Sequence, residues 1–592
     1  MAIRPWGVVA RCAGAGFPLA AALFTLSLST PALADDELSI NIGGKVQSDL
    51  RFRTERKGIG DFYNRIELPE GPERNWNILS INTDAEYGRF KAVAQIDFTL
   101  DGFSQDLQTV GDLYRIDKVE PYWFQVQSLY INAKGLFLDG LDLRIGQQVV
   151  SWGVGDQFNP TNTLNSDDLR DPLLFGKQAG NFMVKADYWL NEDVSFSGVM
   201  VPVFQPALLP RSAPLYTAAV GRLPFTDAEL RHRIIAENGA SASSFLNSPV
   251  AVSNAKPVLP ETNFENMQWA YRIAGSFGEQ DIALSYYYGR NDFPVPIANH
   301  TTLKKGQQCD PADKTRCIDG VLETEVTLGY PKMHVYGLNA TGEIPLSWIK
   351  DDLHGIGYRL EAGLFVPERT TIKLTQDALD LAIPQPAGEY DYDGDGVPGG
   401  PEPVVVENTP FLKWVVGLDY SVGEHFYVNA QWVHGLVDEY GAGDFIDEGW
   451  AVRDSNVTTD EGDTVFRCAL QKTGETCARE LLHPRLGDYV VLGMDFRFLN
   501  NALLLRLFNI LDVSGVVEEK WDEAQEKRVR VHHSPFSEEG FSMVVYPEAN
   551  YNFGNGLELA AGALLQLGKD YTKFGDPAAG GSTVWTRGKF SF

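Results

Sequence analysis

Apolar and polar residues alternate strictly along many short stretches of the chain. In the stretch 90–101, Phe90, Ile96 and Phe98 are apolar, whereas the intervening Lys91 and Asp97 are charged. The stretches 411–422 and 487–499 repeat the pattern. A period of two residues is typical of a β-strand with one apolar and one wetted face. The sequence therefore predicts an all-β fold whose strands have two unlike faces.

The links between these strands alternate in length. About eighteen segments can be marked, near residues 37–55, 76–88, 90–101, 122–134, 141–151, 180–190, 193–203, 267–277, 280–290, 329–343, 357–368, 411–422, 425–437, 487–499, 502–512, 540–552, 556–567 and 582–592. Short links such as 191–192 follow every even-numbered segment, and long ones such as 204–266 follow the odd-numbered ones. A soluble sandwich has no reason to gather its long loops at one end. The rhythm predicts a transmembrane antiparallel β-barrel of about 18 strands with short periplasmic turns and long extracellular loops.

The charged residues of the wetted faces are expected to point into the barrel. Ionised groups at alternate positions would be costly in a dry core, but they are tolerated in a water-filled lumen while the other face meets lipid. The predicted lumen cations are Arg51, Arg53, Lys91, Arg144, Lys185, Lys413, Arg497, Arg506, Arg587 and Lys589, and the acids are Asp49, Asp97, Asp187, Asp419, Asp495 and Glu558. This excess of cations predicts a mildly basic wall that favours anions, unless the charges pair with one another.

The first 34 residues have the character of a signal peptide. Arg4 and Arg11 precede a run without charge over 13–30, and Ala32 and Ala34 provide a small-x-small cleavage site. Residues 35–592 are then expected to form the barrel, and they contain no run of about 18 apolar residues for a membrane helix. The formal net charge of -29 argues against nucleic acid as a partner, because phosphate would repel such a chain.

The chain ends on alternating aromatic residues. Phe590 and Phe592 alternate with Lys589 and Ser591. This end resembles the terminal strand that the outer-membrane assembly machinery recognises in barrels of Gram-negative bacteria. The resemblance implies an outer-membrane location, with outer-membrane lipids, lipopolysaccharide and the assembly machinery as partners.

A longer motif follows the fifth predicted strand. Arg144, Gly146, Gln147, Trp152 and Gly153 are followed by Asn159-Pro160 and by the run 167–172. The stretch resembles the R-x-G-x-Q-x-x-x-W-G…N-P pattern of porin-like outer-membrane families, some of which are suspected of handling lipids or other hydrophobic cargo with inner-membrane exporters. We expect Trp152 to anchor at the outer membrane interface.

The loop that carries this motif has two possible arrangements. It folds inward as a constriction, as in many porins, or it only stiffens the rim. In the first arrangement its charged residues, Asp156, Asp167, Asp168, Arg170, Asp171 and Lys177, would line or brace the opening. The residues expected at the pore or constriction are Arg51, Arg53, Lys91, Arg144, Asp156, Asp168, Arg170, Asp171, Arg497 and Arg506.

Two further loop features suggest bonds or ligands. Cys309 with Cys317 and Cys468 with Cys477 are close pairs, which in an exported chain predict two local disulfides. Asp391, Asp393, Asp395, Gly396 and Glu402 satisfy D-x-D-x-D-G-x5-E, the oxygen-rich spacing of a calcium loop. The stretch therefore predicts a structural Ca²⁺ site, with a solvated acidic turn as the alternative. A capping pattern at 226–229 predicts a short helix in the longest loop.

Eighteen strands enclose a lumen wider than side chains can fill, so an aqueous channel is the expected consequence. The sequence therefore predicts a porin-like channel for small or polymeric solutes. Two alternatives stay open, namely a conduit for lipid or hydrophobic cargo that works with an inner-membrane or periplasmic transport partner, and a surface scaffold or adhesin anchored by the barrel. Catalytic motifs such as G-x-S-x-G and H-E-x-x-H do not occur, and an enzyme is not expected.

Overall fold

The described part of the chain is almost entirely β-sheet. A computed structural model describes residues 38–59, 66–103, 107, 109–174, 176–214, 250–309, 314–315, 317–347, 355–368, 370–375, 402–406, 410–440, 486–522 and 527–592. Within these ranges no helix is both long and apolar enough to cross a membrane.

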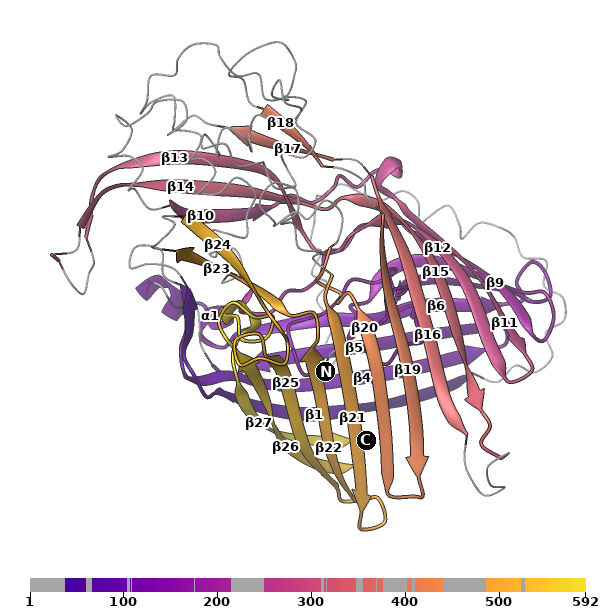
Figure 1. Ribbon diagram of the computed structural model, residues 1–592. Helices are drawn as coiled ribbons and strands as arrows, with labels where there is room; N and C mark the ends of the chain where they lie inside the picture. Colours follow the sequence, from indigo (N-terminus) through magenta and orange to yellow (C-terminus); the bar gives the residue numbers. More distant parts are fainter. Residues whose placement is uncertain are drawn as a thin grey trace, which may run out of the picture.

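Eighteen strands form one closed antiparallel barrel (Figure 1). They are β1 (Ser39–Arg53), β4 (Gly71–Tyr87), β5 (Phe90–Asp101), β6 (Tyr122–Lys134), β7 (Leu141–Gln148), β8 (Asn181–Trp189), β9 (Val194–Val201), β11 (Gln268–Phe277), β12 (Gln280–Arg290), β15 (Lys332–Ile344), β16 (Ile356–Pro367), β19 (Phe411–Val422), β20 (Phe426–His434), β21 (Asp488–Phe498), β22 (Leu503–Asp512), β25 (Ser542–Asn552), β26 (Leu557–Gly568) and β27 (Thr583–Ser591). The first strand pairs with β4 on one side and with the last strand, β27, on the other, which closes the ring. The predicted barrel of about 18 antiparallel strands is confirmed.

Each predicted segment contains one barrel strand, with differences at a few ends. The second strand begins at Gly71, earlier than the expected residue 76, and β7 ends at Gln148 although the alternating pattern continues to residue 151. The early end of β7 has a physical cause, because the chain leaves the wall there and turns into the barrel. Residues 149–180, which we call the inserted segment, lie between β7 and β8.

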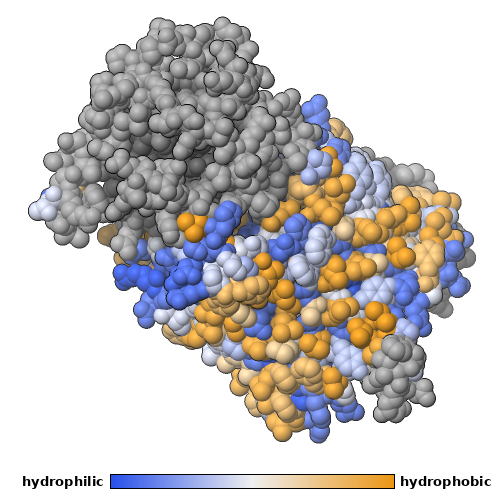
Figure 2. Space-filling model, in the orientation of Figure 1, coloured by the Kyte–Doolittle hydropathy of each residue, from blue (hydrophilic) through white to orange (hydrophobic). Residues whose placement is uncertain are grey.

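The two faces of the strands differ as expected. On β1 the side chains of Asp49 and Arg51 are 0% and 1% exposed, whereas the neighbouring Phe52 is 39% exposed. On β21 Val490 and Phe496 are exposed and Val491 is buried. Figure 2 shows apolar residues over much of the barrel wall below the outer loops. The apolar face is therefore the outer one, in contact with lipid, and the charged face is inside.

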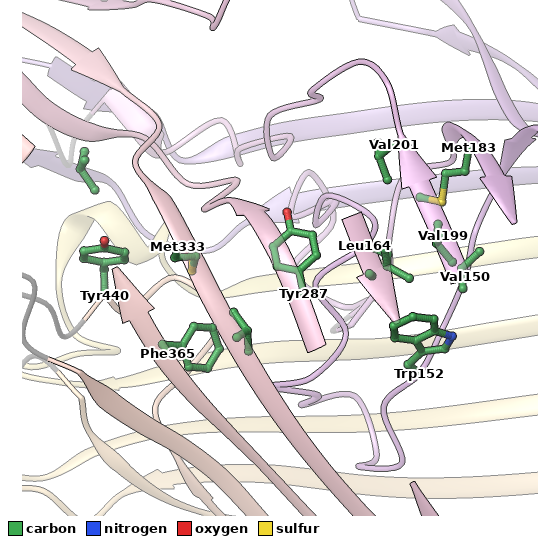
Figure 3. Packing of buried hydrophobic residues seen from close by; sticks show 13 residues of the cluster. Val150, Trp152, Leu164, Met183, Val199, Val201, Tyr287, Met333, Phe365 and Tyr440 are labelled. Atoms are coloured by element: carbon green, nitrogen blue, oxygen red, sulfur yellow. The ribbon is translucent and has the colours of Figure 1, made fainter. Parts of the chain in front are cut away.

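The inserted segment packs into the lumen on apolar side chains. Trp152 is only 4% exposed and belongs to a buried cluster with Met183, Val199 and Tyr287, which point inward from the wall (Figure 3). A second cluster joins Phe158 and Leu173 of the segment to inward residues of β19 to β27. The expectation that Trp152 anchors at the outer membrane interface was wrong, because burial inside the barrel removes its large ring from both water and lipid.

The long outer loops contain strands that the alternating pattern did not predict. A five-stranded sheet has the order β10 (Val250–Pro257), β14 (Cys317–Gly329), β13 (Val295–Cys309), β17 (Thr370–Thr375) and β18 (Glu402–Val406). Its hairpin β13–β14 extends well beyond the barrel in Figure 1. Two small hairpins, β2 (Lys57–Ile59) with β3 (Ile66–Leu68) and β23 (Val516–Asp522) with β24 (Lys527–His533), complete the sheets. Within the described residues four short helical elements lie in the loops: η1 (Val110–Tyr114), α1 (Ile116–Val119), η4 (Phe264–Asn266) and η7 (Pro577–Ala579).

Candidate pore and its inserted segment

One buried carboxylate on the wall holds the first half of the inserted segment. Glu361, in the middle of β16, is 2% exposed. Its Oε2 accepts hydrogen bonds from the backbone N–H groups of Val154 and Gly155 at 2.7 and 2.9 Å. Its Oε1 accepts from the N–H and the hydroxyl of Thr161 at 2.7 and 2.8 Å. Four donors of the segment are thus satisfied by a single ionisable side chain, which fixes the chain across the lumen from its origin on β7.

Neighbouring strands add polar contacts at the same level. The Asp156 carboxylate accepts hydrogen bonds from Arg359 of β16 at 3.0 Å and from Asn429 of β20 at 2.9 Å. On β15, Asn339 donates to the backbone carbonyl of Trp152 at 2.6 Å. Side chains of three strands therefore position this turn, as expected for a site whose geometry is fixed by the surrounding wall.

The second half of the segment is clamped to the opposite wall by charge. Asp171 forms ion pairs with Arg51 of β1 and Arg74 of β4, each at 2.8 Å. Asp49 of β1 in turn contacts Arg74 at 2.7 Å and Arg587 of β27 at 2.9 Å. Burial alone would raise the pKa of Asp171, but the charges and hydrogen bonds of its two arginine partners hold that pKa well below its ordinary value. The carboxylate therefore stays ionised in its buried position.

A third carboxylate, Asp168, organises the part of the segment that faces β6. It accepts a two-point contact from Arg170, at 2.8 and 2.7 Å, and an ion pair from Lys177 at 2.8 Å. Although burial works in the opposite direction, the hydrogen bonds of Arg170 and the charge of Lys177 lower the pKa of Asp168 to about 2. Arg170 also donates to the side-chain oxygen of Gln125 on β6 at 2.7 Å.

The inserted segment leaves a cavity on each of its two sides. The outer cavity, which we call the vestibule, has a volume of about 480 Å³ and is bordered by the outer loop 571–581. The inner chamber, of about 510 Å³, lies toward the periplasmic ends of β1, β26 and β27. Leu174 lines both cavities and thus lies between them.

Cations outnumber anions in both cavities. Six cationic and four anionic side chains line the vestibule, and four cationic and three anionic ones line the inner chamber. The inner set consists of Lys45, Lys177, Arg587 and Lys589 against Asp97, Glu548 and Glu558. Pairing is extensive even so, since Lys589 contacts Glu558 at 2.8 Å and Arg587 contacts Asp49. The lumen therefore combines mutual ion pairing with a small excess of positive charge.

The structure separates the predicted pore residues into three groups. Arg51, Asp156, Asp168, Arg170 and Asp171 meet at or around the inserted segment. Three others lie on the wall with local partners: Arg53 pairs with Glu73, Arg506 pairs with Asp495, and Arg144 lies over the ring of Tyr130.

The third group lies away from the segment. Lys91 and Arg497 stand next to the periplasmic turns, at the opposite ends of their strands from the outer loops. Lys91 pairs with Asp84 and Glu86, and Arg497 is exposed. Alternation indicates the face on which a residue lies but not its height in the barrel. The sequence therefore could not distinguish these two periplasmic positions from positions at the constriction.

Sequence reasoning missed several residues that hold the segment, among them Glu361 and Arg74. Glu361 lies in the middle of the predicted segment 357–368, where a carboxylate between Leu360 and Ala362 was the available signal. Arg74 precedes the expected start of the second strand and so was not assigned to any face.

Most of the residues predicted to bind Ca²⁺ or to form disulfides lie outside the described ranges. The backbone register of β13 and β14 places Cys309 opposite Cys317. Cys468, Cys477, Asp391, Asp393 and Asp395 lie outside the described residues, as do the signal peptide and the helix near 226–235, and Glu402 begins β18. Within the described ranges no group of three or more His, Cys, Asp or Glu side chains is arranged to hold a metal ion. Both the disulfides and the Ca²⁺ site stay predictions.

Comparisons with known proteins give similarity at the level of shape only. No protein-family model matches the chain, and no curated protein matches it. Among solved structures it is similar to OccAB3 of Acinetobacter baumannii, with 10% identity, a TM-score of 0.40 and coverage of 94% of this chain and 99% of that one. OccK5 (OpdH) of Pseudomonas aeruginosa gives 9%, 0.39, 94% and 97%, and the outer membrane channel DcaP of Acinetobacter baumannii gives 9%, 0.35, 94% and 97%.

The location of the protein follows from its own barrel. A closed ring of eighteen antiparallel strands with an apolar exterior pairs most of its backbone groups between strands and so can lie in hydrocarbon. Among membrane proteins, such closed barrels are the architecture of the outer membrane. The protein is an outer-membrane β-barrel of the Gram-negative type.

Proposed function

We propose that the protein is a porin-like channel for small solutes, with a preference for anions, in which the inserted segment forms the constriction. The observation that carries the proposal is the placement of this segment. It is held inside the barrel by the buried carboxylate of Glu361 on one wall and by the buried Arg51 and Arg74 on the opposite wall, and it leaves a cation-rich cavity on either side of Leu174. A segment that only stiffened the rim would not need anchors in the middle of β16.

The expected selectivity is modest. Charges that line a narrow passage raise the local concentration of the opposite ion, but here most cations also have acidic partners. Only the small surplus acts on passing ions. The lumen therefore supports a general channel for anionic solutes better than a site that holds one substrate tightly.

The test is ion selectivity in planar bilayers. Lys45 lines the inner chamber, so Lys45→Glu reverses the surplus there, and the reversal potential in a KCl gradient should move toward cation preference. A change of two charges at a few ångströms in salt water predicts a shift of about two- to fourfold in the permeability ratio. Lys134→Glu is the matched control, because Lys134 is exposed near a periplasmic turn and lines neither cavity.

Steady ohmic openings with this response would support the proposal. A folded, heat-modifiable barrel that conducts no ions would refute it and would favour the scaffold hypothesis. Equal selectivity in wild type, Lys45→Glu and Lys134→Glu would show that ions do not pass the inner chamber.

A further inference from the structure

The barrel wall has a gap above β7. This strand ends at Gln148, and its pairing with β6 extends only from Leu129 to Lys134. Within the described residues, the outer half of β6, from Tyr122 to Ser128, pairs with β5 alone. The wall is incomplete there because the chain turns into the lumen as the inserted segment.

Two glycines set the lower edge of the gap. A Cβ on Gly180, where the segment returns to the wall, would lie 2.1 Å from the carbonyl oxygen of Gln127 on β6. At Gly146 on β7 the backbone has a φ of 134°, and a Cβ would lie 2.3 Å from the carbonyl oxygen of Leu129. The backbones approach this closely only because both residues lack a side chain. Below this level the wall is sealed, and above it a gap remains.

A cavity of about 700 Å³ occupies this gap, and we call it the lateral notch. Its outward border consists of Phe124, Leu129 and Phe182, which are 62%, 54% and 43% exposed on the lipid side of the barrel. Its inward border includes Trp123, Arg170 and Leu208. The volume is in the range of small-molecule sites, and the lining changes from apolar to cationic from lipid to lumen.

The cationic end of the notch carries a positive surplus. Asp168 is shared by Arg170 and Lys177, so this group of three side chains has one more cation than anion. Arg170 uses its Nε and Nη2 for Asp168 and Gln125, and its Nη1 makes no hydrogen bond within the described residues. Arg170 also lines the vestibule, so the notch and the vestibule meet at this side chain.

We propose that the lateral notch binds a fatty acid from the outer leaflet, with the carboxylate at Arg170 and the acyl chain along Phe124, Leu129 and Phe182. Charge and geometry support this ligand class. An arginine with a spare donor group matches a carboxylate, and a groove open to hydrocarbon accommodates an alkyl chain without exposing it to water. The notch gives the lumen the lateral access that a conduit for hydrophobic molecules requires, and it does not depend on ion conduction.

The experiment measures binding of radiolabelled palmitate to the full-length protein in nanodiscs. Leu208→Trp fills the notch and should reduce binding at least about tenfold. Leu209→Trp is its matched control, since the neighbouring Leu209 is exposed and lines neither the notch nor the vestibule. Arg170→Gln should weaken the affinity for palmitate about tenfold, the loss expected for one charge-assisted hydrogen bond. The affinity for hexadecanol, which has no carboxylate, should stay unchanged. Arg170→Lys should keep part of the palmitate affinity that Arg170→Gln loses. A heat-modifiability assay verifies that each variant is folded.

The outcomes separate the sources of the ligand and the two proposals. Displacement of labelled palmitate by unlabelled palmitate but not by anionic phosphatidylglycerol supports a fatty-acid site, whereas equal displacement by phosphatidylglycerol overturns the fatty acid in favour of a membrane lipid. Equal palmitate binding by wild type, Leu208→Trp and Leu209→Trp overturns the notch itself. Palmitate binding by a protein that conducts no ions would overturn the channel proposal and support the notch proposal. Ion conduction without notch-dependent palmitate binding would support the channel proposal and overturn the notch proposal.

Discussion

Releasing the inserted segment from Glu361 is the most direct perturbation of the pore. In Glu361→Gln one carboxylate oxygen remains an acceptor, and the other is replaced by an amide group that donates. Because each oxygen of Glu361 accepts two hydrogen bonds, either orientation of the amide leaves two of the four donors of the segment without their acceptor.

The size of the effect follows from these contacts. A hydrogen bond to a charged group contributes about 1.5–3 kcal/mol, and lumen water replaces part of any bond that is lost. Taking the lower value, two lost bonds give about 3 kcal/mol. The ratio of inserted to released segment should then fall by more than about a hundredfold. Glu361→Ala removes all four acceptor contacts and should have a larger effect in the same direction.

Single-channel recording detects the released state as larger and noisier openings. We expect wild type to show one dominant conductance and Glu361→Gln to visit a higher one. Glu343→Gln is the control, because Glu343 is an exposed glutamate near the β15–β16 turn that accepts from the Gly355 N–H and does not contact the segment. Identical conductance and noise in wild type, Glu361→Gln and Glu361→Ala, with all barrels folded, would refute the view that this carboxylate holds the constriction.

Three further predictions concern Asp171, Trp152 and the β13–β14 hairpin. The pKa of Asp171 is held below its ordinary value, so its stabilising contribution is complete above that value and is lost only as the pH falls toward the lowered pKa. The difference in conductance between wild type and Asp171→Asn should therefore stay constant from pH 7 to about pH 4. Loss of that difference near neutral pH would contradict this assignment. Trp152→Ala removes a buried ring and should lower the free energy of unfolding in urea by about 3–5 kcal/mol, and a loss below about 1 kcal/mol would show that the cluster is not a stabilising core. Peptide mapping by mass spectrometry should recover a peptide pair linked through Cys309 and Cys317 that separates on reduction, and free thiols at both positions would exclude the bond.

The barrel was predictable because its cause is local. A strand between lipid and a wet lumen must alternate in polarity at every second residue, and that requirement is visible in any ten-residue window. The same reasoning correctly placed Arg51 and Asp495 on the inner face, where both are buried. It failed at Trp152, because a tryptophan at a strand end occurs both in interfacial girdles and in buried cores, and only the direction of the following chain distinguishes the two.

The anchors of the inserted segment were not predictable in the same way. The contact of Asp171 with Arg51 spans 120 positions, and that of Thr161 with Glu361 spans 200. No local pattern links residues this far apart, since their meeting depends on the height of each strand in the closed ring and on where the chain leaves the wall. The extra strands of the outer loops were missed for a related reason, because they pair partly in parallel with distant segments, as β10 does with β14.

The inserted segment links the pore and the lateral notch through one geometric fact. It leaves the wall at Gln148 and returns at Asn181, and these two residues are register partners across β7 and β8. The first apolar cluster and Glu361 attach its first half to β8 to β16, whereas the second cluster attaches it to β19 to β27 and Asp171 ties it to β1 and β4. The inner chamber, which marks the open passage, is lined by β1, β4 to β6 and β25 to β27. The gap in the wall opens beside that passage, because the residues that would have completed β7 are the ones that cross the lumen. A chain that narrows its pore with a segment taken from the wall therefore creates a lateral opening at the same time, and a variant that releases the segment should alter both ion conduction and ligand access from the membrane.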